Sequence, residues 1–404
     1  MARSIAIADY TYDLPDDRIA QFPLSDRSAS KLLCYKTGNI RDYHFRDVPD
    51  LLPADTTLVF NTTKVVCARI LFPIAGKSKP VEIFILEPAN NIPMEQAMSQ
   101  KDAATWKCLV GQHKYFTAET ISKPIEWQGQ SGVVYAGKPV QDGDVFLVHF
   151  KWTPGITFSE MLDACGQIPL PPYMKRQVEL SDAARYQTVY ANEQGSVAAP
   201  TAGLHFTNDI IASLHHKHIG IVHVALHVGA GTFRPVKAAT MEGHTMHAEE
   251  ISVTRDMLLR CCDHSDTIVA VGTTSLRTLE SLFWLGLKWK LFPDAGIPEV
   301  HQWDAYDIQV PDGFSYVDAL RVLIDKMDAH QLTTLTTKTR LLIAPGYTIR
   351  SAKGLITNFH QPDSTLLLLV AAFIGEDWKR VYAHALEGGY RFLSYGDSSL
   401  LWRS

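Results

Sequence analysis

Histidine is the residue type that first suggests chemistry, because half of the 16 histidines lie between residues 205 and 247. An imidazole changes its charge near neutral pH and can therefore accept or donate a proton during catalysis. His215, His216 and His218 fall at the end of an expected helix, where positive charge is favourable, and are interpreted as surface residues. The other histidines of this region lie beside apolar segments, which makes them candidates for a site.

The strand expected over residues 220–229 carries apolar side chains on one face and becomes polar on the other toward its carboxyl end, at His227. In open α/β sheets, ligands bind outside the carboxyl ends of strands, and glycine lets the backbone approach a ligand closely. The residues that follow and that fit such a site are Gly229, Gly231, Thr232 and Arg234. A buried histidine followed by an ordinary turn is the alternative; we favour a functional His227 and Arg234.

A second constellation is IVAVGTTSLRTLES, residues 268–281, in which an apolar strand runs into a turn and then a helix. The free N–H groups of a helix start, together with hydroxyl groups, bind anions. The polar residues there are Thr273, Thr274, Ser275 and Arg277. Arg277 in the first turn opposes the helix dipole unless an anion offsets it, so we expect a carboxylate or phosphate ligand. A plain helix cap with a solvated arginine is the alternative, and the segment matches neither glycine-rich nucleotide-binding loop.

Three further segments place polar residues near the ends of apolar runs. Asn358 and His360 follow an expected strand, His205 follows a tight turn in AAPTAGLHFT, and Asp397 lies in YRFLSYGDSSLL. Taken singly, each could be structural. Their shared position after strands favours one common site.

His244, His247 and Glu249 have a spacing that could ligate a metal ion. They lack the H-E-x-x-H order of zinc enzymes, and the six scattered cysteines offer no partner cluster. We therefore expect no metal, and we expect His247 and Glu249 to act as polar or acid–base groups.

Tyr173, Lys175 and Arg176 follow a proline-rich segment that must be extended. Aromatic stacking combined with cationic contacts is typical of single-stranded RNA recognition. A solvated loop is the alternative.

The composition excludes several classes of protein. The chain has 404 residues, 46% of them hydrophobic, and a net charge of −5, which suits two or three globular domains and not a disordered tail or a polycation. The longest apolar run, residues 366–374, is far shorter than the about 20 residues of a membrane span. The start of the chain lacks the apolar stretch of a signal peptide. We therefore expect a cytoplasmic protein with reduced cysteines and no membrane partner.

The apolar pattern predicts an α/β fold. Strands that alternate with helices outside the middle of the chain indicate a mainly parallel sheet. Short β-like runs in the middle, separated by Gly, Asn, Pro and Asp, predict an inserted all-β, barrel-like domain. We expect a discontinuous α/β catalytic domain, residues 1–69 and 153–404, interrupted by a β-barrel domain, residues 70–152. Residues 286–340 are interpreted as an irregular excursion with one helix over 317–327.

In their order along the chain, these segments resemble one family, the S-adenosylmethionine:tRNA ribosyltransferase-isomerases of queuosine biosynthesis. The set spans nearly the whole chain and is far more specific than any single motif. The matching pieces are YDLPDDRIAQFPLSDRSASKLL (12–33), LVFNTTKVVCAR (58–69), IPLPPYMKR (168–176), YQTVYANEQGSVAAPTAGLHFT (186–207), HVGAGTFRPV (227–236), HTMHAE (244–249), VGTTSLRTLES (271–281), ITNFHQPDSTLLLLVAAF (356–373) and YRFLSYGD (390–397). Two departures are Lys64, where the family usually has arginine, and residues 286–340, which are longer than the family's usual connection.

The resemblance implies an α/β domain interrupted by a β-barrel, with no metal and no prosthetic group. It implies an enzyme that uses S-adenosylmethionine as a ribosyl donor and co-substrate. The acceptor would be the 7-aminomethyl-7-deazaguanine base at the wobble position of a tRNA, and the products would be epoxyqueuosine tRNA, adenine and methionine. We expect this tRNA and S-adenosylmethionine as partners, no DNA partner, and a monomer.

This chemistry suggests roles for the candidate residues. The sulfonium of the donor acidifies the adjacent 5′ carbon, so a base could remove that proton before adenine leaves. We expect the catalytic group to be His205, His227 or His360. The expected substrate-binding residues are Thr201, Gly203, Gly229, Gly231, Thr232, Arg234, His247, Glu249, Thr273, Thr274, Ser275, Arg277, Asn358 and Asp397. Among these, Arg234 and Arg277 would hold the donor's carboxylate or an RNA phosphate. The expected RNA-binding residues are Tyr173, Lys175 and Arg176.

Two other functions are alternatives. A related enzyme could transfer the ribosyl group of S-adenosylmethionine to a different acceptor, and the negative net charge favours this alternative because tRNA affinity draws on phosphate contacts. A non-catalytic RNA-binding protein fits less well, because it would not need the histidine, arginine and asparagine positions after the strands.

Overall fold

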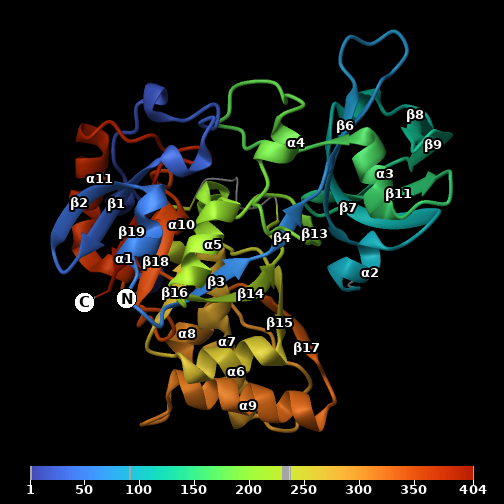
Figure 1. Cartoon of the computed structure of the whole chain (residues 1–404). Helices are drawn as coiled ribbons and strands as arrows, with labels where there is room; N and C mark the ends of the chain where they lie inside the picture. Colours follow the sequence, from blue (N-terminus) through green and yellow to red (C-terminus); the bar gives the residue numbers. More distant parts are fainter. Residues whose placement is uncertain (1, 91, 230–235, 237, 404) are drawn as a thin grey trace.

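The computed structural model describes residues 2–90, 92–229, 236 and 238–403. The chain folds into a large lobe around a nine-stranded sheet and a small lobe around an eight-stranded sheet (Figure 1). Between the lobes, β4 (Thr63–Val65) and β13 (Glu193–Ser196) pair as parallel strands. Within the described residues, no helix combines the length and the apolar character that crossing a bilayer would require.

The small lobe is an antiparallel sheet that curls around its own core. Its strands are β5 (Arg69–Phe72), β6 (Val81–Pro88), β7 (Ala103–Gly111), β8 (Thr120–Trp127), β9 (Gln130–Gly137), β10 (Val140–Asp142), β11 (Val145–Trp152) and β12 (Gly166–Gln167). Helices α2 (Met94–Met98) and α3 (Phe158–Cys165) pack on it, and the Phe158 ring of α3 stacks on Trp106 with centroids 4.6 Å apart.

The predicted barrel is only partly confirmed. Among the described strands, β12 and β8 are the two ends of the sheet order and do not pair with each other, so the sheet stays open. The side chains of α3 fill the interior between these edges. Because α3 and β12 follow residue 152, part of this lobe's core lies beyond the boundary expected there, and the domain limits themselves stay a prediction.

The large sheet is mixed, so the prediction of a mainly parallel sheet is also only partly confirmed. Its strands, in spatial order, are β17 (Thr334–Thr339), β15 (Glu249–Thr254), β14 (Gly220–Leu226), β3 (Thr57–Asn61), β16 (Ile268–Val271), β18 (Gly354–Asn358), β19 (Ser398–Trp402), β1 (Lys31–Lys36) and β2 (Asn39–His44). The central strands β14, β3, β16 and β18 are parallel neighbours. Antiparallel pairs flank them, because β15, β17, β19 and β2 run the other way relative to an adjacent strand.

Apolar side chains of the central strands are buried on both faces, as expected for strands covered by helices on each side. In β16, Ile268 and Ala270 join one core cluster while Val269 and Val271 join another. The helices on the first face are α6 (Arg255–Asp263), α7 (Thr273–Leu291), α9 (Tyr316–Ala329), α10 (Thr365–Ile374) and α11 (Trp378–Glu387). Helices α1 (Val48–Leu51) and α5 (Asn208–His216) cover the other face, and α4 (Asp182–Arg185) lies toward the small lobe (Figure 1).

Residues 286–340 are more regular than expected. Helix α7 continues to Leu291, and α8 (Asp304–Asp307) follows. The helix predicted over 317–327 is present as α9, begins at a capping box formed by Ser315 and Asp318, and packs on α7. Strand β17 then pairs with β15 at the edge of the large sheet, so this segment builds a helical layer and an edge strand.

Candidate active site

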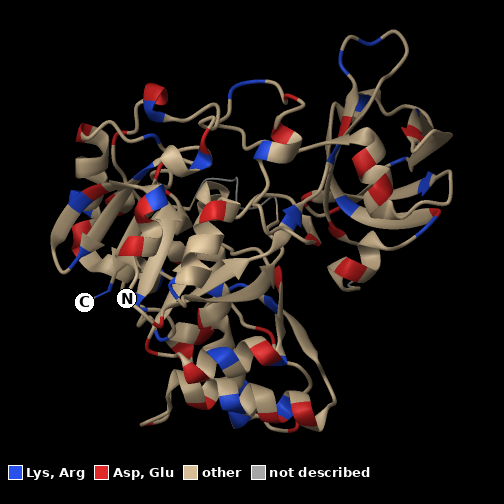
Figure 2. Cartoon of the chain, in the orientation of Figure 1, with Lys and Arg blue, Asp and Glu red and all other residues tan. Residues whose placement is uncertain are grey.

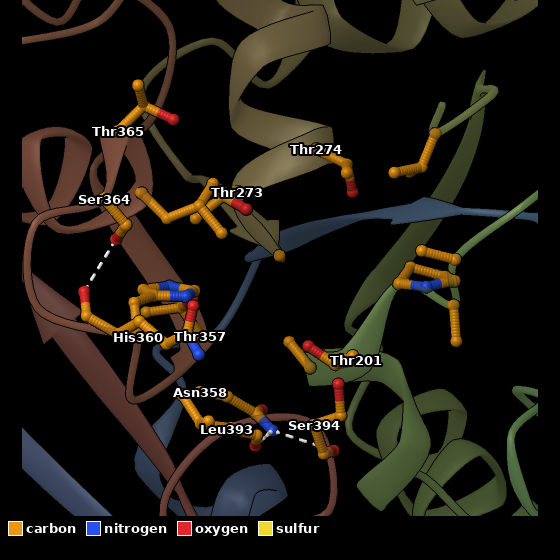
Figure 3. A pocket seen from close by; sticks show the side chains of 18 of the residues that line it. Thr201, Thr273, Thr274, Thr357, Asn358, His360, Ser364, Thr365, Leu393 and Ser394 are labelled. Carbon is orange, nitrogen blue, oxygen red and sulfur yellow. Dashed lines mark hydrogen bonds between the residues drawn. The ribbon is translucent and has the colours of Figure 1, made fainter. Parts of the chain in front are cut away.

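A cavity lies where the carboxyl ends of β16 and β18 meet the start of α7; we call it the main cavity (Figure 3). Several segments that are distant in the sequence line it, which is the convergence that the strand-end rule predicts. The predicted site residues among its lining are Tyr173, Thr201, His247, Glu249, Thr273, Thr274, Arg277, Asn358 and His360.

The start of α7 forms one wall of the main cavity. Gly272 turns the chain from β16 into the helix with a φ of 91°, a conformation that L side chains rarely adopt. Thr273 and Thr274 begin the 19-residue helix, so its free N–H groups lie beside the cavity.

Arg277, one turn into α7, forms an ion pair with Glu249, and their side chains are only 11% and 4% exposed. The Nε atom of Arg277 is buried and has no hydrogen-bond partner among the described residues. A carboxylate or phosphate entering the cavity would satisfy this N–H and would complement the helix start.

His360, two residues after the end of β18, also lines the main cavity (Figure 3). Its Nε2 atom is 2.8 Å from Thr357 Oγ1, its backbone N–H donates to Tyr382 Oη at 3.1 Å, and its carbonyl accepts from the Tyr12 hydroxyl. Burial lowers the pKa of His360 to about 4. The imidazole is therefore neutral at pH 7.

Asn358 and the turn at Leu393 and Ser394 form the floor. Asn358 Nδ2 donates to the carbonyl oxygens of Leu393 and Ser394 at 2.9 and 3.2 Å (Figure 3). His205 is buried behind Asn358, with Nε2 3.2 Å from its Oδ1 atom, and is absent from the lining of the main cavity within the described residues. Burial lowers the pKa of His205 to about 4.

His227 lies outside the main cavity, in a position between two other cavities at the junction of the lobes. It is buried, which lowers its pKa to about 4, and its Nδ1 atom has no partner within the described part of the chain. Its neighbour Val228 lines the main cavity instead, because successive residues point in opposite directions along an extended chain.

Three predicted binding residues occupy structural positions. The Ser275 hydroxyl donates to a backbone carbonyl one turn earlier at 2.8 Å. At Gly203, a Cβ atom would lie 2.0 Å from the Tyr190 hydroxyl, so glycine is needed there for packing. The Asp397 carboxylate accepts two backbone N–H groups at 3.0 and 2.8 Å and ties separate segments together.

Gly229 lines one of the cavities at the lobe junction, together with His227 and His247. His247 also lines the main cavity, so the two cavities adjoin at this residue. Gly231, Thr232 and Arg234 lie outside the described residues.

The three predicted RNA-binding residues differ in their surroundings. Tyr173 faces the main cavity, and its hydroxyl is 2.5 Å from Ser394 Oγ. Lys175 is exposed and pairs with Asp16 at 2.6 Å. Arg176 is mostly buried and binds Asp182 through two nitrogen–oxygen contacts of 2.7 Å, which favours a structural role.

Several lining residues were missed in the sequence. Thr357, Ser364, Thr365, Tyr186 and Ser394 all contribute to the main cavity. Ser364 could have been found, because D-S-T before a long apolar run is a helix-start pattern, and Ser364 indeed caps α10. Tyr186 and Ser394 lie in irregular segments whose placement depends on tertiary contacts. The described residues contain no group of three or more His, Cys, Asp or Glu side chains that could hold a metal ion.

The three buried histidines predict that the protein loses stability in mild acid. Their folded-state pKa values of about 4 lie below the usual value of about 6.5 in an unfolded chain, so the unfolded state binds more protons between these limits. The contribution of these three histidines to the free energy of unfolding should be constant above about pH 7.5 and should fall on acidification, by about 1 kcal/mol per pH unit for each histidine near pH 5. Urea unfolding at pH 5, 6 and 7 measures this slope. The slope should be smaller in His227→Gln, and equal stability at pH 5 and 7 would contradict the expectation.

The chain is similar to proteins of queuosine biosynthesis. The family model described as "Queuosine biosynthesis protein" matches residues 7–401. A protein of Desulfitobacterium hafniense (strain DSM 10664 / DCB-2) called S-adenosylmethionine:tRNA ribosyltransferase-isomerase is 36% identical over 409 residues, which cover 98% of this chain and 99% of that protein. A protein of the same name from Azoarcus sp. (strain BH72) is 35% identical over 405 residues, with 99% of each chain covered. The crystal structure of S-adenosylmethionine tRNA ribosyltransferase from Thermotoga maritima matches with 24% identity and a TM-score of 0.45, covering 97% of this chain and 99% of that one.

Proposed function

This chain belongs to the family of queuosine biosynthesis proteins, and we propose how its main cavity carries out the family's reaction. It acts as an S-adenosylmethionine:tRNA ribosyltransferase-isomerase. It transfers and isomerises the ribosyl group of S-adenosylmethionine onto the 7-aminomethyl-7-deazaguanine base at the tRNA wobble position, and it releases adenine and methionine. S-adenosylmethionine is a co-substrate, and we propose that the reaction needs no metal and no prosthetic group.

The observation that carries the assignment of the site is the pairing of an anion-binding wall with a histidine wall in one cavity. The helix start at Thr273 and the partly unpaired guanidinium of Arg277 suit the methionine carboxylate. With the carboxylate held there, the ribose of the donor would lie toward His360, which lines the same cavity.

His360 is the proposed proton-transfer group. Its neutral imidazole is in the form that accepts the proton from the 5′ carbon, which the sulfonium acidifies. Burial disfavours the imidazolium so formed, and it therefore gives the proton readily to the departing adenine. One side chain thus serves as base and then as acid.

The tRNA would approach from the side on which two basic loops project. In the view of Figure 2, Lys and Arg are interspersed with Asp and Glu over both lobes. The loop between β5 and β6, which contains the exposed Lys77 and Lys79, and the segment around Lys175 both project from the upper side in Figure 2. Phosphate contacts from such loops would position the anticodon arm over the main cavity.

Replacing Lys175 with alanine should weaken tRNA binding only modestly. The side chain of Lys175 is 66% exposed and its pair with Asp16 lies on the surface, so its loss leaves the fold intact. The slope of log K against log salt should become smaller by about one unit, as expected for one lost phosphate contact. Fluorescence titration with tRNA at several salt concentrations measures this. Lys379→Ala on α11 is the control. It removes a comparable surface pair with Glu376 and should leave the slope unchanged. An unchanged slope in Lys175→Ala would show that this residue does not contact an RNA phosphate.

The function itself is tested with purified protein, S-adenosylmethionine and tRNA that carries the precursor base. Adenine should appear only when that tRNA is present. Release that needs no tRNA would favour transfer to another acceptor.

We further propose that the protein works in the cytoplasm, where tRNA is modified, and as a monomer without a DNA partner, because one chain supplies both walls of the main cavity.

A further inference from the structure

A continuous set of buried hydrogen bonds runs behind the floor of the main cavity. Ser30 Oγ lies 2.8 Å from His205 Nδ1, and His205 Nε2 lies 3.2 Å from Asn358 Oδ1. Asn358 Nδ2 then reaches the carbonyl groups of Leu393 and Ser394. The connection joins four segments that are distant in the sequence.

The direction of each hydrogen bond follows from the chemistry of the groups. The two carbonyl groups can only accept, so the amide nitrogen of Asn358 must face them and its Oδ1 must face His205. Because Oδ1 also only accepts, His205 carries its proton on Nε2 and donates it. His205 Nδ1 is then unprotonated and accepts from the Ser30 hydroxyl at 2.8 Å, and the carbonyl oxygen of Arg27, at 3.2 Å from the same hydroxyl, is the more distant acceptor. Both ring nitrogens of His205 are therefore occupied inside the protein.

The turn to which Asn358 donates its hydrogen bonds has an unfavourable backbone conformation. Leu393 has a φ of 69°, in the left-handed region that residues other than glycine rarely adopt. Both Leu393 and Ser394 line the main cavity, and Ser394 Oγ in turn lies 2.5 Å from the hydroxyl of Tyr173, another lining residue. If the amide of Asn358 turned over, both carbonyl groups would lose their donor and the floor would rearrange.

We propose that His205 is a positioning residue, which acts by fixing the amide orientation of Asn358 and thereby the floor of the cavity that binds the donor. This inference rests on the proposed function, since the effect is read in the ribosyl-transfer reaction. His205 then positions Asn358, whereas His360, whose side chain faces the cavity, transfers the proton.

Two substitutions of His205 distinguish positioning from proton transfer. The amide nitrogen of His205→Gln can take the place of Nε2 and donate to Asn358, whereas the shorter side chain of His205→Asn reproduces only the Nδ1 position. We expect His205→Gln to keep kcat/KM within about threefold of wild type and His205→Asn to lose about 10- to 100-fold, the effect of leaving a buried polar group unpaired. The pH profile of kcat should have the same shape in His205→Gln and wild type. Equal inactivity of both variants, or a displaced pH profile in His205→Gln, would overturn the proposal.

A double-mutant cycle tests whether His205 acts through Asn358. His205→Leu and Asn358→Leu should each lower kcat/KM. The kcat/KM of the double variant should be no lower than that of the less active single variant, because both substitutions remove the same contact. Additive losses would overturn the proposal. Assays run well below each variant's melting temperature separate this effect from unfolding, and His223→Asn on β14, an exposed histidine outside the main cavity, is the control. Wild-type adenine release in the same assay shows that the proposed function holds, so the two ideas can fail separately.

Discussion

His360→Gln is expected to lower kcat for tRNA-dependent adenine release by about 10²- to 10⁴-fold, the usual contribution of a general acid–base group. Glutamine preserves much of the shape and can still hydrogen-bond to Thr357, so the cavity should stay intact. What it cannot do is accept the proton from the donor's 5′ carbon or return it to adenine. The decrease should therefore appear in kcat at saturating S-adenosylmethionine and tRNA.

Calorimetric titration of S-adenosylmethionine into His360→Gln provides the companion measurement, and its Kd should match wild type. His384→Gln is a matched control, because His384 is a half-buried histidine on α11 that contacts Asp42 and is not among the residues that line the main cavity. Wild-type kcat in His360→Gln would assign the proton transfer to another group.

Arg277→Met should have the second largest effect, this time on binding of the donor. The substitution removes the guanidinium proposed to hold the methionine carboxylate and leaves the buried Glu249 beside that carboxylate. Truncating one partner of a buried charge pair costs about 2–5 kcal/mol, so we expect Kd for S-adenosylmethionine to rise by at least about 30-fold. Calorimetry and the KM for the donor both report this change.

Glu249 complicates that experiment, because a buried carboxylate that loses its ion pair with Arg277 also destabilises the fold. The double variant Arg277→Met, Glu249→Gln removes the charge and should recover stability without recovering donor binding. Arg260→Met, which breaks an exposed pair with Asp256 on α6, is the matched arginine control. Wild-type affinity in the double variant would show that the carboxylate is bound elsewhere.

The rule that ligands bind at the carboxyl ends of strands accounts for the part of the site that the sequence predicts well. Residues after β16 and β18, such as Thr273, Arg277 and His360, lie in one cavity because those strands are parallel neighbours. Each was identifiable from an apolar run followed by a polar turn.

His227 shows where the same rule is insufficient. It also follows a strand of the parallel centre, yet Val228 rather than His227 lines the main cavity. The alternation of side chains tells which residues share a face of a strand. It does not tell which of the residues that follow the strand point into the site. Strand direction is equally absent from apolar periodicity, so the antiparallel edges formed by β15 and β17 could not be predicted.

Arg176 illustrates a different limit. A cation beside an aromatic residue predicts RNA contact, but its two hydrogen bonds to Asp182 already occupy the guanidinium. Whether a charged side chain is available to a partner depends on ion pairs that spacing alone does not reveal. Lys175, one residue earlier, also forms an ion pair, with Asp16, but both side chains are exposed, and such surface pairs contribute little.

A crystal structure with S-adenosylmethionine bound would show where the donor lies. The donor should occupy the main cavity, with its carboxylate on Arg277 and the start of α7 and its ribose beside His360. A donor seated instead in a cavity at the lobe junction, against His227 and away from His360, would contradict it.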